Sequence, residues 1–415
     1  MVLPTLNAFI NFSTGPSFAQ DMILDTGLLD VNILSSGGGS GPTVDVSSVV
    51  RSVQTKRGRN GISNQFQTGT LTLVIIDQNG DFNPQNPTSP YYTYLTPMKK
   101  VQITATYSGV TYPIFSGFIT SYSTAIPDAS TGSVALTTIT AVDALYLAQN
   151  AQISTVSGAT AGQLSGARVG KILDAISWPT SMRDVDAGLT TLQVDPGTAR
   201  TALAALQTVA ESEFGAIYVD ASGSFTFQDR QLTSTSVTGT PVVFADDGSG
   251  IKYFNAVWLL NDALIFNSAQ ITATGLAVQS YSDAASIAKY FLHSYNAQNL
   301  LMEDTATALN YASMLVASNA ETSIRCDAIE LDLYMDSYTA GTIAALDLDF
   351  FDPVTISTTQ PGSTTLTKTL QVFGKNMTIA PGVWKVTLTT LEPIIDAFIL
   401  DSALYGILDT SVLSY

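Results

Sequence analysis

Alternating apolar and polar residues dominate the first third of the chain and predict β-strands. The run Thr70–Ile76 (TLTLVII) places an apolar side chain at every second position, which is typical of a strand with at least one buried face. Similar runs predict strands at Val101–Tyr107 and Tyr112–Tyr122, joined at Ser108-Gly109, and at Ser133–Val142. Because the connections are short, we expect these strands to pair antiparallel.

Two earlier segments, Asn7–Phe12 and Thr43–Val53, also predict strands. Residues 35–41 (SSGGGSG) lie between them and are so rich in glycine and serine that they predict a flexible tether. Prolines between positions 84 and 97 predict an irregular loop, since proline lacks an N–H and has a fixed φ. Residues 1–148 therefore predict a small antiparallel barrel or sandwich of roughly six or seven strands.

After residue 149 the apolar residues recur at helical spacing. Those from Val169 to Ile176 lie on one helix face, and the helix is expected to end at Trp178-Pro179. A second helix is predicted with Thr198 as its N-cap and an apolar face running from Leu203 to Ala210. A β-hairpin at 215–227 follows, so residues 149–245 predict an α/β domain.

Strands return in residues 246–395, and a short tail, 396–415, follows. The residues alone predict antiparallel β structure with two helices in this block. The predicted strands are Phe254–Trp258, Ile324–Tyr334, Thr365–Ala380 and Val383–Leu391, and the predicted helices are Ser282–Tyr295 and Asp304–Ala317.

The amino-acid composition predicts that the chain is part of an assembly. Only 12% of its 415 residues are charged and 45% are hydrophobic, which suits extensive burial against other subunits, and the length predicts roughly two to four domains. The net charge of −17 argues against a nucleic-acid-binding protein, since such proteins neutralise phosphates with Lys and Arg. An acidic wall would let DNA slide past without sticking, although ordinary solubility explains the charge equally well.

Signals for export and for redox or catalytic chemistry are weak. The first residues lack a basic region and a cleavage motif, so no signal peptide is expected. No apolar run has the length of a membrane span, so no transmembrane helix is expected. The single cysteine, Cys326, excludes an intrachain disulfide and predicts a core thiol. His293 has no G-x-S-x-G elbow to work with, so we expect a packed or half-exposed histidine. We predict no enzyme, no catalytic residue and no cofactor.

Two acidic clusters meet the requirements of a metal site only in part. Asp77-x-Asn79-x-Asp81 is spaced like the start of a calcium loop, but Phe82 and Thr88 stand where that loop needs glycine and glutamate. A tight turn at Asn79-Gly80 is therefore favoured. The cluster Asp347-x-Asp349-x-x-Asp352 is expected to place two carboxylates on one strand face toward solvent. No metal is predicted at either place.

One basic cluster stands out, formed by Lys56, Arg57 and Arg59. Two interpretations stay open for it. The cluster could meet an acidic surface of another subunit, which is plausible in so acidic a chain. It could equally end a strand and pair with carboxylates of its own chain.

The segment from residue 55 to 122 resembles the minor tail, or tail-tip hub, proteins of long-tailed phages of actinobacteria. It shows their RGR cluster, strand and turn, Pro/Tyr loop and hairpin in order, with Gln78 where those proteins usually have Asn. Residues 202–230 resemble the α/β domain of such hubs, and Ile379–Pro393 resembles a strand signature with one extra Thr. The residues that carry the resemblance are Arg57, Gly58, Arg59, Phe66, Gly69, Asp77, Gly80, Phe82, Pro84, Ala105, Tyr107, Pro113, Phe115, Gly117 and Trp384.

The resemblance implies a fold that is mainly β with an α/β insertion: two related antiparallel β-barrel domains and a small α/β domain. It implies a homotrimeric structural hub at the virion's tail tip, synthesised in the host bacterial cytoplasm. Two similar units in each of three chains would match a sixfold tail tube. The implied partners are the distal tail protein ring, the tape-measure protein and downstream minor tail or receptor-binding proteins, with DNA only as passing cargo.

The C-terminal tail carries an apolar-acidic phrase twice, at 398–401 and 406–409, and the resembling proteins end in a similar way. Such an apolar end is expected to pack on this chain or on a neighbouring one. The residues expected in that contact are Phe398, Ile399, Leu400, Ile407 and Leu408.

Two other functions are kept as alternatives. A tail protein that binds host-wall carbohydrate would display clustered aromatic residues, for which Tyr91, Tyr92 and Tyr94 are the dense candidates. A tail-associated hydrolase would need a pair of catalytic carboxylates, and any acidic chain offers candidate pairs. The chain has no lysozyme-like helical segment, which favours the structural role.

Overall fold

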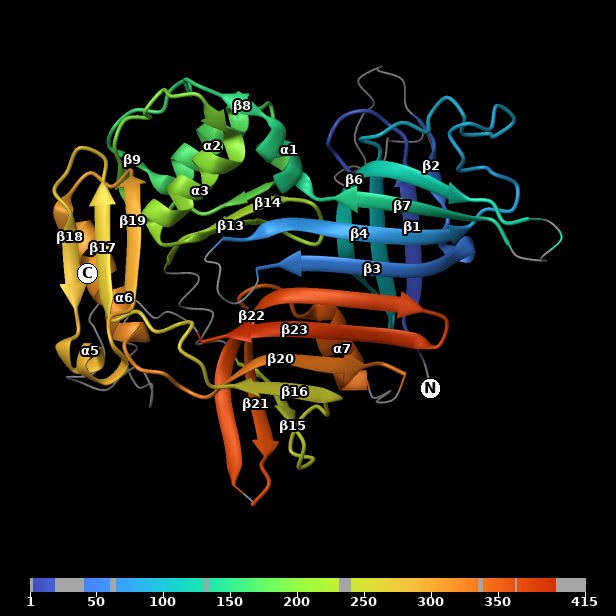
Figure 1. The fold of residues 1–415 in the computed structure, drawn as a ribbon. Helices are drawn as coiled ribbons and strands as arrows, with labels where there is room; N and C mark the ends of the chain where they lie inside the picture. The colour runs from blue at the N-terminus through green and yellow to red at the C-terminus, as the bar shows by residue number, and fades with distance from the viewer. Residues whose placement is uncertain are drawn as a thin grey trace.

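The computed structural model describes residues 3–18, 41–59, 65–128, 130, 134–230, 240–334, 339–362 and 364–392 (Figure 1). Within these residues the chain is mainly β, and most of its helical residues lie in an α/β part and in a smaller unit beside it. The predicted class, mainly β with an α/β insertion, is confirmed at this level. In this described part, no helix combines the length and the apolar character that crossing a membrane requires.

The first β region contains the strands that the alternating pattern predicts, with one difference. The predicted strand Thr43–Val53 is divided by a 3-10 turn at Ser47–Val49. There the Asp45 carboxylate accepts a hydrogen bond from the Ser47 N–H, and the Ser47 hydroxyl accepts one from the Ala8 N–H. The strands are β1 (Thr5–Asn11), β2 (Thr43–Asp45), β3 (Val50–Gly58), β4 (Gln67–Ile76), β5 (Lys100–Tyr107), β6 (Val110–Ala125) and β7 (Leu136–Val142).

The second β region contains the predicted long strands and a helix that was not predicted. Helix α7 (Thr339–Asp347) is apolar along most of its length and packs into the core. Asp347 therefore ends a helix and Asp349 lies in the following loop, so the expected strand face with two exposed carboxylates is wrong. The strands are β15 (Val242–Ala245), β16 (Asn255–Leu259), β20 (Arg325–Asp332), β21 (Pro353–Thr359), β22 (Thr365–Ala380) and β23 (Val383–Leu391).

The two β regions share one sheet, because β22 pairs antiparallel with β3. The strands β7, β4, β3, β22, β23, β20 and β16 follow one another from top to bottom in Figure 1. One large core cluster contains residues of both regions, including Leu73 from the first and Leu388 from the second.

Strand order repeats between the two regions. The first runs β3-β4-β7-β6-β5-β1, and the second runs β16-β20-β23-β22-β21-β15. The outermost pair differs, since β1 is antiparallel to β5 whereas β15 is parallel to β21. Strand β2, which pairs with β1, has no counterpart in the described part of the second region, and the other strands of the first region each have one.

Pairing register repeats as well. Phe118 of β6 pairs with β5 at Lys100 and with β7 at Val142, and Gln371 of β22 pairs with β21 and β23 in the same way. In both long strands the ladder then skips one residue, Thr120 in β6 and Phe373 in β22. These β-bulges bend each strand so that its two halves belong to different parts of the sheet.

A backbone strain site also repeats. Met98 has φ 66° and its N–H donates to the Ile119 carbonyl, while Phe351 has φ 68° and its N–H donates to the Val372 carbonyl. Left-handed φ is uncommon for residues other than glycine, so its recurrence at equivalent positions is a specific sign of one unit built twice.

The α/β part packs three helices around a small sheet and has its own core. The second predicted helix begins later than expected. Its N-cap is Thr201, whose hydroxyl accepts a hydrogen bond from the Ala204 N–H, because residues 200–201 still pair with another strand. The elements are α1 (Ala144–Asn150), β8 (Gln152–Ile153), β9 (Gln163–Leu164), α2 (Ser165–Ala175), β10 (Arg183–Val185), β11 (Thr191–Leu192), β12 (Arg200–Thr201), α3 (Ala202–Glu213), β13 (Ala216–Val219) and β14 (Phe225–Gln228).

Between β16 and β20 the chain forms a separate small unit, at the far left of Figure 1. The predicted helix Ser282–Tyr295 is confirmed only in part: it spans α5 (Ala284–Tyr290), because Phe291 has φ 64° and Ser294 begins a strand. The predicted helix from Asp304 is confirmed, with Asp304 as its N-cap. The other elements are β17 (Ser268–Ala273), β18 (Gln279–Ser282), β19 (Ser294–Leu300) and α6 (Thr305–Asn319).

Candidate functional site

The β3–β22 junction holds the basic cluster that the sequence singles out. Because side chains alternate along β3, Lys56 is exposed whereas Arg57 points inward and is buried. The Arg57 guanidinium donates to Asp349 Oδ2 at 3.2 Å and to the Val219 carbonyl at 3.3 Å. It also lies 4.8 Å from the centroid of the Phe350 ring. Arg57 thus joins the first β region, the second β region and the α/β part.

Gly58 lets the two β regions approach each other. Its φ is +109°, and a Cβ placed on it would lie 2.3 Å from the Phe373 carbonyl oxygen and 2.4 Å from the Cα of Gly374. No other residue type fits such a distance without a backbone shift. The glycine of the RGR cluster is therefore explained by close approach of two strands.

Lys375 is a buried cation beside this junction that the sequence analysis did not identify. Its ammonium donates to the Leu346 and Leu348 carbonyls at 2.7 and 2.6 Å, at the C-terminal end of α7. Carbonyl groups there favour a positive charge. Burial nevertheless lowers the pKa of Lys375 to about 8, and the neighbouring Asp349 carboxylate opposes this shift.

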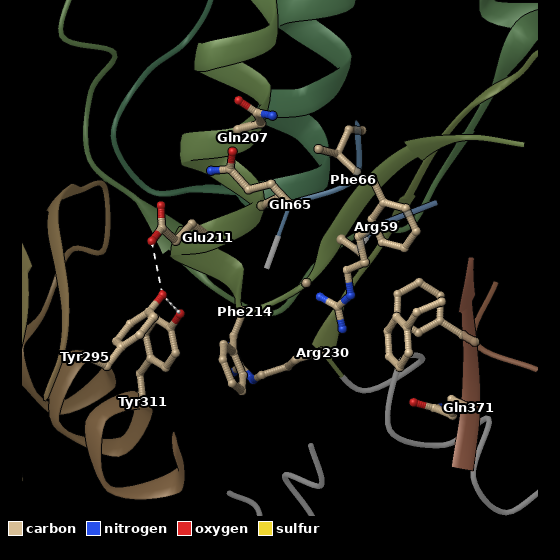
Figure 2. A pocket seen from close by; sticks show the side chains of 16 residues that line it. Arg59, Gln65, Phe66, Gln207, Glu211, Phe214, Arg230, Tyr295, Tyr311 and Gln371 are labelled. Carbon is tan, nitrogen blue, oxygen red and sulfur yellow. Dashed lines mark hydrogen bonds between the residues drawn. The ribbon is translucent and has the colours of Figure 1, made fainter. Parts of the chain in front are cut away.

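A cavity of about 100 Å³ lies beyond the junction, between the two β regions, α3 and the small unit (Figure 2). Aromatic rings line much of it, and the Arg59 guanidinium lies 3.9 Å from the centroid of the Phe373 ring. The Tyr295 hydroxyl hydrogen-bonds to Glu211 Oε1 and to the Tyr311 hydroxyl, both at 3.3 Å. Burial raises the pKa of Glu211, and the Tyr295 hydrogen bond opposes the shift. Aromatic rings therefore form much of the cavity wall, and the acid in that wall, Glu211, is hydrogen-bonded to Tyr295. Arg59 and Arg230, the arginines of the wall, make other interactions within the chain.

Asp77 makes a turn, as predicted. Its carboxylate accepts hydrogen bonds from the N–H groups of Asp81 and Phe82 and from the Thr137 hydroxyl. Gly80 takes φ +68° in the same turn. Those donors occupy the carboxylate, and the described residues contain no cluster of three potential metal ligands.

Gly69 depends on a buried acid that the sequence analysis missed. Asp143 accepts hydrogen bonds from the Gly69 N–H at 2.6 Å and from the Leu145 N–H at 3.0 Å, which makes it the N-cap of α1. Burial raises the pKa of Asp143 to about 7, while these two N–H groups lower it. An Asp immediately before Ala144-Leu145 is an N-cap signal that could have identified it.

The remaining predicted residues lie in the core or close to it. Phe66 joins an aromatic group with Tyr218 and Phe350 at centroid distances of 5.0 and 4.9 Å. Gly117 approaches the Val142 carbonyl so closely that a Cβ would lie 2.5 Å from it. Pro84 is half-buried and Pro113 is exposed. The other buried residues in this set are Phe82, Ala105, Tyr107, Phe115, Cys326 and Trp384.

The residues named for the alternative functions are occupied in ordinary packing. Tyr91 stacks on Phe12 at 5.6 Å, and Tyr94 lies 5.9 Å from the same ring, which leaves Tyr92 as the exposed member of the three. His293 is half-buried, with Nε2 3.0 Å from the Tyr290 carbonyl oxygen. Phe398, Ile399, Leu400, Ile407 and Leu408 lie outside the described residues, as does most of the glycine-rich tether.

The fold is similar to that of two tail proteins. One is a tail protein from Neisseria meningitidis MC58, at 10% identity and a TM-score of 0.55, covering 94% of this chain and 97% of that chain. The other is the 43 kDa tail protein of prophage MuSo2 from Shewanella oneidensis, at 12% identity and a TM-score of 0.54, covering 85% and 96%. No protein-family model matches the sequence, and no curated protein is significantly similar to it. The likeness therefore concerns the fold, over nearly the whole chain.

Proposed function

We propose that this chain is a structural virion protein of a phage tail and forms a homotrimeric hub at the tail tip. The observation that supports the proposal most directly is the repeated β unit, with its shared strand order, register and bulge. A likeness in fold to two proteins called tail proteins supports the same role.

Symmetry matching is the proposed mechanism. Two similar β units in each of three chains would present six equivalent surfaces to a sixfold tail tube. The inner wall of that ring would line or close the DNA channel, and the net charge of −17 would keep passing DNA from adhering. Obligate assemblies of this kind commonly bury more than about 2,000 Å², which suits a chain with few charged residues.

The proposed division of the chain follows from the same role. Residues 1–148 and 246–395 would form the two tube-like domains, the latter carrying the unit from β17 to α6 as an insertion. Residues 149–245 would form the α/β domain. The α/β domain, the insertion and the tail 396–415 would contact the proposed partners, which are the distal tail protein, the tape-measure protein and downstream receptor-binding proteins.

The carbohydrate-binding alternative has less support in this fold, because Tyr91 and Tyr94 pack against Phe12 and leave no cluster of exposed rings in that loop. No specific observation favours a hydrolase. A zymogram with host cell wall is expected to show no clearing.

Mass and imaging test the proposal together. Sedimentation equilibrium of the purified protein is expected to give a mass three times the 43.9 kDa of one chain. Averaged electron-microscope images are expected to show a ring with nearly sixfold features. A tag on the chain should label one end of the tail in whole particles. Infectious particles with complete tails that lack this chain would contradict the role.

A further inference from the structure

The repeated β unit leaves two strand edges without the neighbour that their counterparts have. The second half of β22, residues 374–379, pairs with β3 along one edge. The equivalent half of β6 begins at Ser121, and no described strand pairs with that edge. In the same way β16, the counterpart of β3, pairs only with β20 and ends the path of the sheet.

The solvent exposure of equivalent side chains also shows that these two edges lack a neighbour. Ile379 in the β22 half is 6% exposed, whereas its counterpart Ile126 after β6 is 73% exposed. Arg57 of β3 is 6% exposed, whereas its counterpart Leu260 is 59% exposed. A large apolar side chain left in water at each equivalent place indicates a surface that is covered in the working state.

We propose that β6 of one copy of this chain pairs antiparallel with β16 of a second copy and so repeats the β22–β3 junction between chains. This inference rests on the proposed assembly of identical copies and names the surface that makes it. Taken from the register of β22 with β3, the expected partners are Ile126 with Ala256, Ala125 with Val257, Thr124 with Trp258, Ser123 with Leu259 and Tyr122 with Leu260.

Side-chain chemistry on the two edges fits this pairing. On the inward face, Tyr122, Thr124 and Ile126 would meet Ala256, Trp258 and Leu260. None of these residues is charged, so closing the interface leaves no ion without water. Tyr122, Ala256 and Trp258 already pack against the edge of the core cluster, so the pairing would continue that core from one chain into the next. Strand addition supplies backbone hydrogen bonds and also covers an edge that would otherwise aggregate.

The pairing is head-to-tail, because it joins two different edges of the same chain. In the described part of the sheet, β20, β23, β22, β3, β4 and β7 lie between β16 and β6, and these two strands do not pair with each other. A head-to-tail contact makes a ring when its rotation closes. Three copies would give six β units joined alternately within and between chains.

One detail differs between the two junctions. Gly58 and Gly374, which approach each other closely, correspond to Asn261 and Ser121. Their side chains keep the backbones farther apart, so the ladder between chains is expected to end at Tyr122 and Leu260. The predicted pairing thus runs over five residue pairs.

A disulfide across the predicted pair tests the register. Ala125→Cys and Val257→Cys are combined in one chain; both positions are exposed, so folding of the single chain is not at risk. Side chains directly opposite in antiparallel strands have Cβ atoms about 4.5–5.5 Å apart, close to the distance that a disulfide spans. Mild oxidation is expected to give a covalent trimer on a non-reducing gel. The native Cys326 is buried and its thiol pKa is raised to about 12, so it should not compete.

Matched variants control for chance oxidation. Ser121→Cys with Val257→Cys is displaced by four residues, roughly 13 Å along the strand, and should not cross-link. Gln54→Cys with Thr378→Cys tests the equivalent junction within one chain and should form an intrachain disulfide. Mixing the two single variants, Ala125→Cys and Val257→Cys, should give covalent dimers and nothing larger. Equal cross-linking of the displaced pair would overturn the register.

Ile126→Glu tests the surface without cysteine. The side chain is exposed in the single chain, so a folded monomer is expected in place of a trimer when mass is measured by light scattering. A wild-type trimer that neither cross-links at 125 and 257 nor dissociates with this variant would overturn the pairing and leave the proposed hub intact. A wild-type monomer at high concentration would overturn the pairing and the proposed trimer together.

Discussion

The β22–β3 junction inside the chain and the two unpaired edges of β6 and β16 occupy equivalent positions in the repeated unit, yet they use different chemistry. The internal junction buries Arg57 and Lys375 and brings Gly58 close to Gly374. At the equivalent positions the unpaired edges carry Leu260, Tyr122, Asn261 and Ser121.

Connectivity explains the difference. Arg57 and Asp349 belong to the same chain, so folding itself brings them together and the buried charge of Arg57 is paired. An edge that pairs with a separate molecule is in water until it is covered, and burying an unpaired charge there would cost far more than burying an uncharged side chain. Buried charge thus marks the junction within the chain, and exposed apolar side chains mark the contact that we propose between chains.

The largest effect is expected where the internal junction is tightest. Gly58→Ala places a Cβ 2.3 Å from the Phe373 carbonyl oxygen at φ +109°, so the free energy of unfolding should fall by about 4 kcal/mol. Gly109→Ala is the matched control, since its φ is +82° but nothing lies within 4 Å of the added Cβ. It should cost about 1–2 kcal/mol. Equal losses in chemical denaturation would show that strand approach is not the constraint.

A pair of equivalent isoleucines gives the next effect. Ile379→Ala removes a buried side chain and should lower the free energy of unfolding by about 3 kcal/mol. Ile126→Ala removes an exposed one and should change the stability of the dilute monomer by less than about 0.5 kcal/mol. Urea denaturation at low protein concentration makes the comparison. A large loss for Ile126→Ala in the monomer would mean that the edge is already covered within the chain.

Lys375 should make stability depend on pH in the alkaline range. Its folded pKa, about 8, lies below the value of about 10.4 in an unfolded chain, so the unfolded state binds more protons between these values. The free energy of unfolding should therefore rise with pH from about 8 to about 10.4, with a slope of roughly 1 kcal/mol per pH unit. The difference between wild type and Lys375→Met, measured by denaturation at pH 8 and pH 10, isolates this contribution. Parallel pH profiles for the two proteins would contradict it.

The smallest effect is expected at the two strained backbone sites. Met98→Gly relieves a left-handed φ but loosens the unfolded chain, so the two contributions nearly cancel, within about 0.5 kcal/mol. Phe351→Gly relieves the same strain but removes a buried ring, and its net effect should be destabilising. Thermal denaturation of both variants compares them. Similar losses at the two sites would show that Met98 has a packing role as well.

Strong periodicity made part of the fold predictable. Strands β22 and β23 have the predicted boundaries, because long alternation with polar turns admits few other interpretations. Asp304 was predicted as the start of a helix and caps α6. Helix α7 was missed because it is apolar on most sides and so has no amphipathic period. The strands β17 to β19 were missed because their sequences are short and polar.

The junction was only half predictable. The sequence singled out Arg57, Gly58 and Arg59, but their partners depend on tertiary contacts. Arg57 and Asp349 are separated by 292 positions, and no local pattern connects them. In the sequence, Lys375 looks like an ordinary strand residue. The carbonyl groups that accept hydrogen bonds from its ammonium lie at the end of α7, a helix that was not predicted. Asp143 is different, since an Asp directly before a helix is a local N-cap pattern that the sequence contains.

The two long strands β6 and β22 have a mechanical consequence. Each is hydrogen-bonded to one neighbour along its first half and to another along its second half, without a break in the chain. A force along such a strand loads many hydrogen bonds in parallel, as shear, instead of opening them singly. The proposed ring would therefore resist a pull along these strands, and its weakest direction would lie across the ladders.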